Sequence, residues 1–117
     1  MNPALKLLPW QLWVVDFGAP TGHRQAGVRP AIVVGSARHC EFRTGMALVV
    51  PLTTRDRSLR HHVRIASVSS GVRLPSWART EEITSVSTLR FGQSPIGLAS
   101  SEEIAELRMW LREMVAF

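Results

Sequence analysis

Short apolar runs, separated by Gly, Pro and polar residues, follow one another along most of the chain. The first three runs are rich in Val, Ile and Leu, and the fourth alternates apolar with polar residues; both patterns are typical of strands. In the fourth run, His62 and Arg64 are expected on the face opposite Val63 and Ile65. The predicted strands are 12–17, 30–36, 46–52, 61–67, 71–74, 76–80, 84–88 and 95–98.

The end of the chain has helical rather than strand periodicity. Ser100, followed three residues later by Glu103, forms a capping box that predicts the start of a helix. The apolar residues that follow form a single helical stripe, namely Ile104, Leu107, Leu111 and Met114. Many short strands and one terminal helix predict a mainly β fold, a small and strongly curved β-barrel with the C-terminal helix packed on it.

Length and composition indicate one globular domain spanning residues 1–117, with 45% hydrophobic and 20% charged residues. The single cysteine, Cys40, excludes a disulfide framework and a cysteine-based zinc site. No apolar run reaches the roughly 18 residues that a membrane span needs. The first residues lack the small-residue cleavage site of a signal peptide. We therefore expect a cytoplasmic protein with no membrane contact.

The charge is strongly basic and unevenly distributed. The formal net charge is +5, and 13 of the 14 basic residues are Arg. Residues 101–117 hold four Glu against two Arg, a net −2, which leaves +7 on residues 1–100. Because the planar guanidinium binds phosphate with two parallel donors, this balance favours an anionic partner, most simply nucleic acid. A basic surface without a specific partner is the alternative.

Three clusters carry candidate chemistry. A Gly-rich loop, 18–28, runs into Arg29 and brings backbone N–H groups where a phosphate can be bound. Thr53 follows a predicted strand and precedes two cations, Arg55 and Arg57. Each feature also has a plain structural explanation, since Arg29 can be a surface cation and Thr53 can close a turn.

The third cluster, Arg79-Thr80-Glu81-Glu82, places a cation beside two carboxylates. Two other candidates are weaker. His61 and His62 are adjacent, so within a strand their rings face opposite ways and form a poor metal pair, and we predict no metal site. Trp77 is expected to pack in the barrel, with a stacking face for a base as the alternative.

The order of these blocks resembles one known family. LWVVDF is followed by TGHRQAGVRPAIVVGS, then by ALVVPLTT, then by RTEEITSV and a terminal helix. Over roughly residues 11–117, this order is similar to the MazF/PemK/Kid family of toxins from toxin–antitoxin pairs. The resemblance implies a dimeric SH3-like barrel that cuts single-stranded RNA at short sequences, needs no metal or other cofactor, and is inhibited by a partner antitoxin.

The resemblance also implies which residues act. Arg29 matches the catalytic Arg of the family's R-P block, and Thr53 matches the catalytic Thr after its P-L step. His23 matches a loop histidine implicated in Kid-like members. Arg79 and Glu81 match an Arg and an Asp near the fifth strand, with Glu in place of Asp.

The chain departs from the family pattern at several positions. Arg24 stands where many members have Glu, and it is expected to contact an RNA phosphate because Gly22 and Gly27 let the loop approach a ligand. Trp10 replaces a frequent Gly, and residues 1–9 form an additional N-terminal arm. The predicted RNA-binding residues are Arg24, Arg55, Arg57, Arg79 and Arg90, the last at a position that is often basic in the family.

Metal-free RNA cleavage requires the 2′-hydroxyl to attack its own phosphate while one group accepts its proton and another protonates the leaving 5′-oxygen. The products are a 2′,3′-cyclic phosphate and a 5′-hydroxyl. Arg29 is expected to stabilise the developing negative charge, and Thr53 to add a neutral hydrogen bond. Arg is almost never deprotonated, so a different group must accept the proton. His23 and Glu81 are both candidates for this general base, and the sequence leaves the choice open.

Two other functions remain open alongside the endoribonuclease toxin. Related proteins of this fold poison DNA gyrase through a C-terminal Trp-Gly-Ile, whereas this chain ends in MVAF. A non-catalytic module that binds RNA or an acidic peptide is the second alternative. The basic field of residues 1–100 predicts that the antitoxin inserts an acidic, partly disordered tail into a groove shared by two chains.

Overall fold

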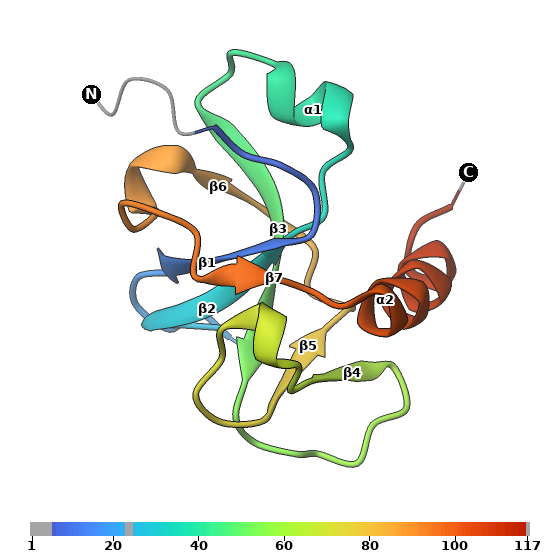
Figure 1. The fold of residues 1–117 in the computed structure, drawn as a ribbon. Coiled ribbons are helices and arrows are strands. Elements are labelled where there is room, and N and C mark those ends of the chain that lie inside the picture. Colours follow the sequence, from blue (N-terminus) through green and yellow to red (C-terminus); the bar gives the residue numbers. More distant parts are fainter. Residues whose placement is uncertain (1–5, 23–24, 117) are drawn as a thin grey trace.

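The computed structural model describes residues 6–22 and 25–116, and its strands belong to one antiparallel sheet (Figure 1). Its order is β4-β5-β3-β2-β1-β7, and β6 pairs with β3 outside this path. The strands are β1 (Gln11–Asp16), β2 (Val28–Val33), β3 (Met46–Thr53), β4 (His62–Ile65), β5 (Ser76–Arg79), β6 (Thr84–Ser87) and β7 (Gly97–Leu98). The helices are α1 (Ala37–Glu41) and α2 (Ser101–Met114), with 3₁₀ turns η1 (Val68–Ser70) and η2 (Thr88–Arg90).

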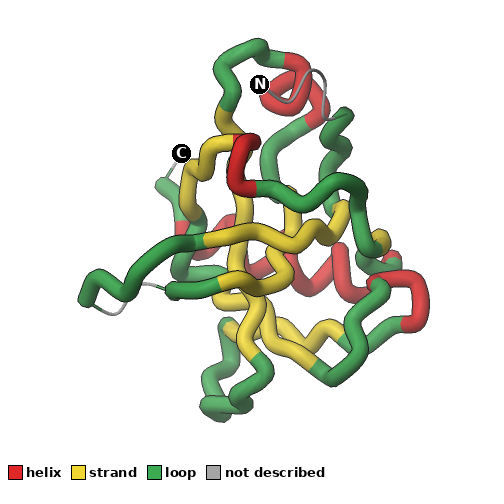
Figure 2. Tube along the Cα trace, turned by 90° about the vertical axis from the view of Figure 1, so that its left-hand side faces the viewer, coloured by secondary structure: helices red, strands yellow, loops and turns green. Residues whose placement is uncertain are grey.

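The sheet curls around β3, its longest strand. Along one edge, the first half of β3 pairs with β6 and its last two residues pair with β5, while β2 pairs with the other edge. As a result β4 and β5 lie at one end of the molecule and α1 at the other, as Figures 1 and 2 both show. The predicted mainly β fold with a C-terminal helix is confirmed as a curled antiparallel sheet carrying α2.

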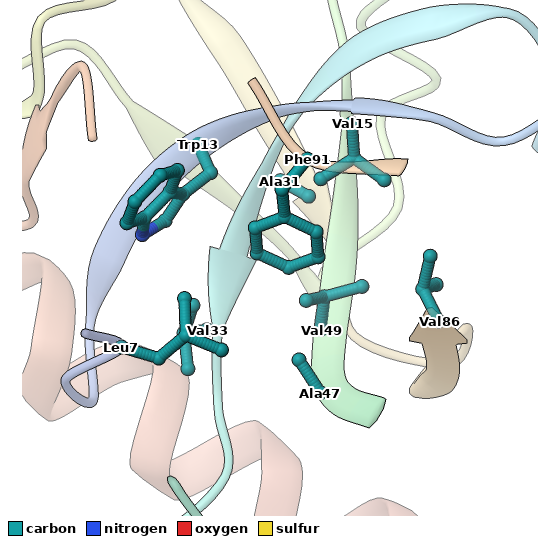
Figure 3. Packing of buried hydrophobic residues seen from close by; sticks show 9 residues of the cluster. All are labelled: Leu7, Trp13, Val15, Ala31, Val33, Ala47, Val49, Val86 and Phe91. Atoms are coloured by element: carbon teal, nitrogen blue, oxygen red, sulfur yellow. The ribbon is translucent and has the colours of Figure 1, made fainter. Parts of the chain in front are cut away.

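Successive side chains of a strand point to opposite faces of the sheet, and an apolar cluster lies on each face. One face carries the cluster drawn in Figure 3, with ring contact between Trp13 and Phe91 at a centroid distance of 5.6 Å. The opposite face packs against α2. The cluster buried between this face and α2 consists of Leu12, Ile32, Val50, Leu52, Val63, Ile65, Ala78, Ala99 and Leu107, the last from α2 itself.

Helix α2 begins and packs as its sequence predicts. Ser100 accepts a hydrogen bond from the N–H of Glu103, and the Glu103 side chain accepts one from the N–H of Ser100. Leu107 is fully buried, and Ile104 and Leu111 pack against the same cluster. In the described part of the chain, no helix is long and apolar enough to cross a membrane.

Glu103 also fastens α2 to the segment after β4. Its carboxylate accepts hydrogen bonds from the N–H groups of Ala66 and Ser67 at 2.9 and 3.1 Å, and from the Ser67 hydroxyl at 2.6 Å. Burial raises the pKa of this carboxyl, but the hydrogen bonds from Ser100, Ser67 and Ala66 outweigh burial and lower it below the usual 4.5.

Replacing Glu103 with Gln is expected to cost about 1–2 kcal/mol of unfolding free energy at pH 7, the lower part of the range for bonds to a charged group, because Glu103 is only half-buried. Since the folded-state pKa is lowered, this stability is present above pH 4.5 and is lost as the pH falls through the folded value. Urea unfolding at pH 7 and at pH 3–4 measures both effects. The exposed neighbour Glu102→Gln is the control; equal losses in the two variants contradict the anchoring role.

Two predicted segments differ from the structure. The strand expected at 71–74 is wrong: Gly71 ends η1 with a φ of 77°, and a Cβ atom there would collide with the backbone of Ile96. The segment 37–45, which lies between two predicted strands and was given no helix, contains α1. Ser36 caps this short helix by accepting a hydrogen bond from the N–H of His39.

Candidate active site at one end of the sheet

The sheet face that carries the Trp13 cluster changes from apolar to polar toward β4 and β5. Residues opposite each other on adjacent strands point to the same face. Val15 pairs with Arg29, and Ala31 pairs with Pro51, so the same register places Arg29 level with Thr53. Thr53 in turn pairs with Trp77, and Trp77 with Arg64. A row of Arg, Thr, Trp and Arg therefore crosses four strands on one face.

Arg29 lies where the Gly-rich loop joins the sheet. Hydrogen bonds from the N–H of Phe17 to Gly27 and from that of Gly27 to Gly18 close the base of this loop, which projects from the body in Figure 2. The half-buried Arg29 donates from Nε to the carbonyl of Ala26 at 2.8 Å. Among the described residues its two terminal nitrogens form no hydrogen bond, so both can donate to an anion.

Thr53 ends β3 with its side chain largely buried. Its hydroxyl oxygen accepts a hydrogen bond from the N–H of Arg55 at 3.2 Å, which tightens the turn leaving the strand. The hydroxyl hydrogen stays free to rotate toward a ligand on the Arg29 side. Arg55 and Arg57 are exposed in the following loop, beside this end of the sheet.

Arg79 is the centre of a buried polar network. Its side chain is only 8% exposed, and Nη1 donates to the Oε1 atom of Gln25 at 2.9 Å. Its guanidinium also forms ion pairs with Glu82 at 3.0 Å and with Glu81 at 3.5 Å. This network joins the Gly-rich loop to β5 and to the turn that follows β5.

Glu81 links Arg79 to two histidines. Its Oε1 atom lies 3.0 Å from Nε2 of the buried His62 and 3.3 Å from Nε2 of His61. Burial raises the pKa of Glu81, but hydrogen bonds from its own N–H and from His62, together with the charges of His62 and Arg79, lower it below its usual range. Glu81 is therefore an anion at neutral pH.

The expectation that the rings of His61 and His62 face opposite ways is wrong. Strand β4 begins at His62, so His61 lies outside it and does not follow the strand alternation. The two rings are instead in edge-to-face contact, with centroids 4.8 Å apart. The predicted placement of His62 opposite Val63 holds, because His62 pairs with Arg79 and Val63 pairs with Ala78.

A small hollow of about 150 Å³ lies between the apolar and polar parts of this face. Its lining residues are Phe17, Gln25, Pro51, Glu82, Ile83 and Thr84. Because Gln25 and Glu82 both contact Arg79, the hollow adjoins the charged network. A ligand that reaches it meets apolar carbon on one side and hydrogen-bonding groups on the other.

The structure groups the sequence-predicted residues unevenly. Arg29, Thr53, Arg79 and Glu81 share one end of the sheet, whereas Arg90 lies at the base of the Gly-rich loop and donates to the carbonyl of Asp16 at 3.2 Å. His23 and Arg24 lie outside the described residues. The thiol of Cys40, against the apolar cluster, has a pKa raised by burial and by Glu41, which makes it a poor nucleophile.

Sequence reasoning missed two members of the site, Gln25 and His62. His62 was placed on the correct face of its strand but was given no role in the site. Gln25 stands in the same Gly-rich segment as His23 and Arg24, and no local pattern marked it as a partner of Arg79. Glu82, by contrast, belongs to the predicted cluster of a cation and carboxylates, and the structure pairs it with Arg79.

The fold and the site define a small, mainly β protein with an Arg- and carboxylate-lined site at one end of a curled sheet. Residues 9–115 match the family model described as the PemK-like, MazF-like toxin of type II toxin–antitoxin systems. The chain belongs to this family.

Individual relatives agree with this assignment. The chain is 29% identical over 104 residues to the endoribonuclease toxin MazF of Escherichia coli K12, covering 89% of this chain and 88% of that protein. The crystal structure of MazF from Deinococcus radiodurans superposes with a TM-score of 0.80 at 21% identity, covering 95% and 97% of the two chains. An endoribonuclease in complex with its cognate antitoxin from a mycobacterial species superposes with a TM-score of 0.73 at 16% identity, covering 95% and 94%.

Proposed function

We propose that this chain is the endoribonuclease toxin of a type II toxin–antitoxin system and cuts single-stranded RNA in the cytoplasm. Membership of the toxin family and similarity to the Escherichia coli endoribonuclease support the activity. The structural observation that carries the proposal is the position of Arg29 level with Thr53, on a face where Arg79 and Glu81 also lie.

In this proposal, the scissile phosphate is bound between β2 and β3. The terminal nitrogens of Arg29 stabilise the negative charge that grows on the phosphate oxygens, and the Thr53 hydroxyl donates a further hydrogen bond. Arg29 is suited to this role because its Nε bond to Ala26 holds the guanidinium in place. No step in this scheme requires a metal ion.

Glu81 is assigned a positioning role. Its oxygens accept from His62 and Arg79, so it holds both side chains in one orientation, and its lowered pKa makes it a weak proton acceptor. A histidine, which titrates near neutral pH, is the better general base, and His23 of the Gly-rich loop is the proposed one.

Thr53→Ala is expected to slow RNA cleavage at least tenfold, about 1.4 kcal/mol of activation free energy, because a hydrogen bond to the phosphate is lost. Thr53→Ser keeps the hydroxyl and is expected to retain most of the activity. The exposed neighbour Thr54→Ala is the matched control. Single-turnover rates on a labelled RNA measure the effect, with thermal unfolding as a check on folding. Undiminished cleavage by a folded Thr53→Ala protein contradicts a role for this hydroxyl.

One side-by-side assay separates the proposed function from the alternatives. The purified protein is incubated in EDTA with labelled single-stranded RNA, and in parallel with gyrase and supercoiled DNA. Cleavage of RNA at a few short sequences, with no effect on gyrase, is the expected result. Inhibition of gyrase with intact RNA identifies a gyrase-directed toxin, and binding without cleavage identifies a non-catalytic module.

We further propose that the toxin is a homodimer and that an antitoxin binds it through an acidic tail. Solved complexes of related toxins with an antitoxin support the binding of an antitoxin, and the net charge of +7 on residues 1–100 attracts an acidic tail. Binding of the antitoxin is expected to weaken with salt and to compete with RNA, measurable by fluorescence anisotropy. Tight simultaneous binding of both refutes a shared site, and a solution mass near 13.0 kDa refutes the dimer.

A further inference from the structure

We propose that His61, His62 and Glu81 form a binding site for a zinc ion, and that zinc bound there inhibits the toxin. The inhibitory part rests on the proposed endoribonuclease function, whereas the binding part stands without it. The three side chains come from two segments: His61 and His62 lie just before and at the start of β4, and Glu81 follows β5. Their ligand atoms converge on one point. One ring nitrogen from each histidine and one Glu81 oxygen all lie within 4.8 Å of one another.

The distances match what a zinc ion requires. Tetrahedral zinc with bonds of about 2.0–2.1 Å keeps its ligand atoms about 3.3 Å apart. The Oε1 atom of Glu81 lies 3.3 Å from Nε2 of His61 and 3.0 Å from Nε2 of His62. His62 is buried and fixed. The side chain of His61 is 27% exposed, so its ring can turn until its nitrogen reaches the same spacing from the His62 nitrogen. This exposure also gives the ion a path from solvent.

The surrounding contacts leave the right atoms available. Arg79 lies 3.5 Å from the Oε2 atom of Glu81, which also lies 3.2 Å from Nε2 of His62, and this contact helps to hold the carboxylate as an anion. The Oε1 atom lies within 3.3 Å of both histidines. The His61 ring is supported on one side by His62 and on another by Trp110, with centroid distances of 4.8 and 6.5 Å. Two imidazoles and one carboxylate suit zinc better than Mg²⁺ or Ca²⁺, which prefer oxygen ligands.

Zinc at this site changes the candidate active site directly. The ion takes the Glu81 oxygen that otherwise accepts from His62, and it places positive charge beside Arg79. Both effects disturb the network that positions Arg79 and the Gly-rich loop. Zinc is therefore expected to slow RNA cleavage, although the cleavage mechanism itself uses no metal.

The test measures binding and cleavage separately. Protein without an affinity tag is freed of metal with EDTA, dialysed, and titrated with zinc chloride by calorimetry; Co²⁺ then replaces zinc as a visible-absorption probe of tetrahedral coordination. One ion per chain is expected. His61→Gln is expected to weaken binding at least tenfold, and its half-exposed position makes loss of folding easy to exclude by thermal unfolding. His39→Gln, far from the site on α1, is the matched control.

Five outcomes are distinguishable. Loss of affinity in His61→Gln but not in His39→Gln supports the site, and equal affinity in all three proteins, or no saturable binding, overturns it. Inhibition of wild-type cleavage at zinc concentrations that track the binding curve, with His61→Gln resistant relative to its own zinc-free rate, supports the inhibitory role. Binding without slower cleavage overturns that role. A protein that binds zinc but never cleaves RNA refutes the proposed function and leaves the zinc site intact.

Discussion

Replacement of Arg29 by alanine is expected to lower the rate of RNA cleavage by about 10²–10³-fold, about 3–4 kcal/mol of transition-state stabilisation. The reason is that Arg29 is the cation level with Thr53 whose terminal nitrogens meet no partner among the described residues. The loss is expected mainly in kcat, because charge on the phosphate grows in the transition state. Single-turnover cleavage at saturating protein measures it.

Two further variants make this result specific. Arg29→Lys keeps the charge but loses the paired donors, and is expected to recover only a small part of the rate. Arg43→Ala removes an exposed Arg near α1, at the far end of the sheet, and is expected to cleave RNA like the wild type. Full activity in Arg29→Ala, or equal losses in Arg29→Ala and Arg43→Ala, contradicts the assignment.

Replacement of Arg79 by methionine is expected to cost about 2–4 kcal/mol of unfolding free energy at pH 7. Methionine fills similar space but leaves Glu82, Glu81 and Gln25 without the guanidinium that joins them. Removing one partner of a buried ion pair costs about 3–5 kcal/mol, and the lower range applies here because Glu81 is one-third exposed. Urea unfolding monitored by Trp fluorescence measures the loss.

The pH dependence separates loss of charge from loss of packing. The folded-state pKa of Glu81 lies below 4.5, so its ion pairs stabilise the fold above that pH, and this stability is lost as the pH falls through the folded value. The difference in unfolding free energy between the wild type and Arg79→Met is therefore expected to shrink below pH 4.5. An equal difference at pH 7 and at pH 3–4 shows that packing alone is affected. Exposed Arg73→Met is the control.

Local sequence patterns were sufficient to predict most of the elements. The capping box at Ser100 and the apolar stripe after it are both observed in α2, because they act within a few residues of one another. The β-branched runs likewise predict the ends of β1, β2 and β3 to within three residues. Arg29 and Thr53 were predicted from the family resemblance. The register between β2 and β3 explains why the two residues lie level with each other on one face.

Long-range contacts were not predictable in the same way. Gln25 and Arg79 are 54 positions apart, and their hydrogen bond depends on how the Gly-rich loop folds back onto β5. The histidine pair shows how sensitive a strand argument is to its boundary. The strand was expected to start at His61, but β4 starts at His62. Because side chains alternate between faces only within a strand, this one-residue difference made the inferred direction of the His61 ring wrong.

Trp10 adopts a backbone conformation that is rare outside glycine. Its φ of 71° lies in the left-handed region that favours glycine, the residue that the family resemblance led us to expect at this position. The Trp10 ring packs against the apolar cluster between the sheet and α2, and the guanidinium carbon of Arg108 lies 5.6 Å from the centroid of the ring.

The most direct test of metal-free RNA cleavage at this site is the chemical state of the RNA ends. Wild-type protein is incubated with single-stranded RNA in excess EDTA, and the fragments are analysed by mass spectrometry, with Arg29→Ala in parallel. We expect 2′,3′-cyclic phosphate and 5′-hydroxyl ends from the wild type and almost none from Arg29→Ala. Fragments with 3′-hydroxyl and 5′-phosphate ends, formed only when Mg²⁺ is added, would contradict metal-free cleavage at this site.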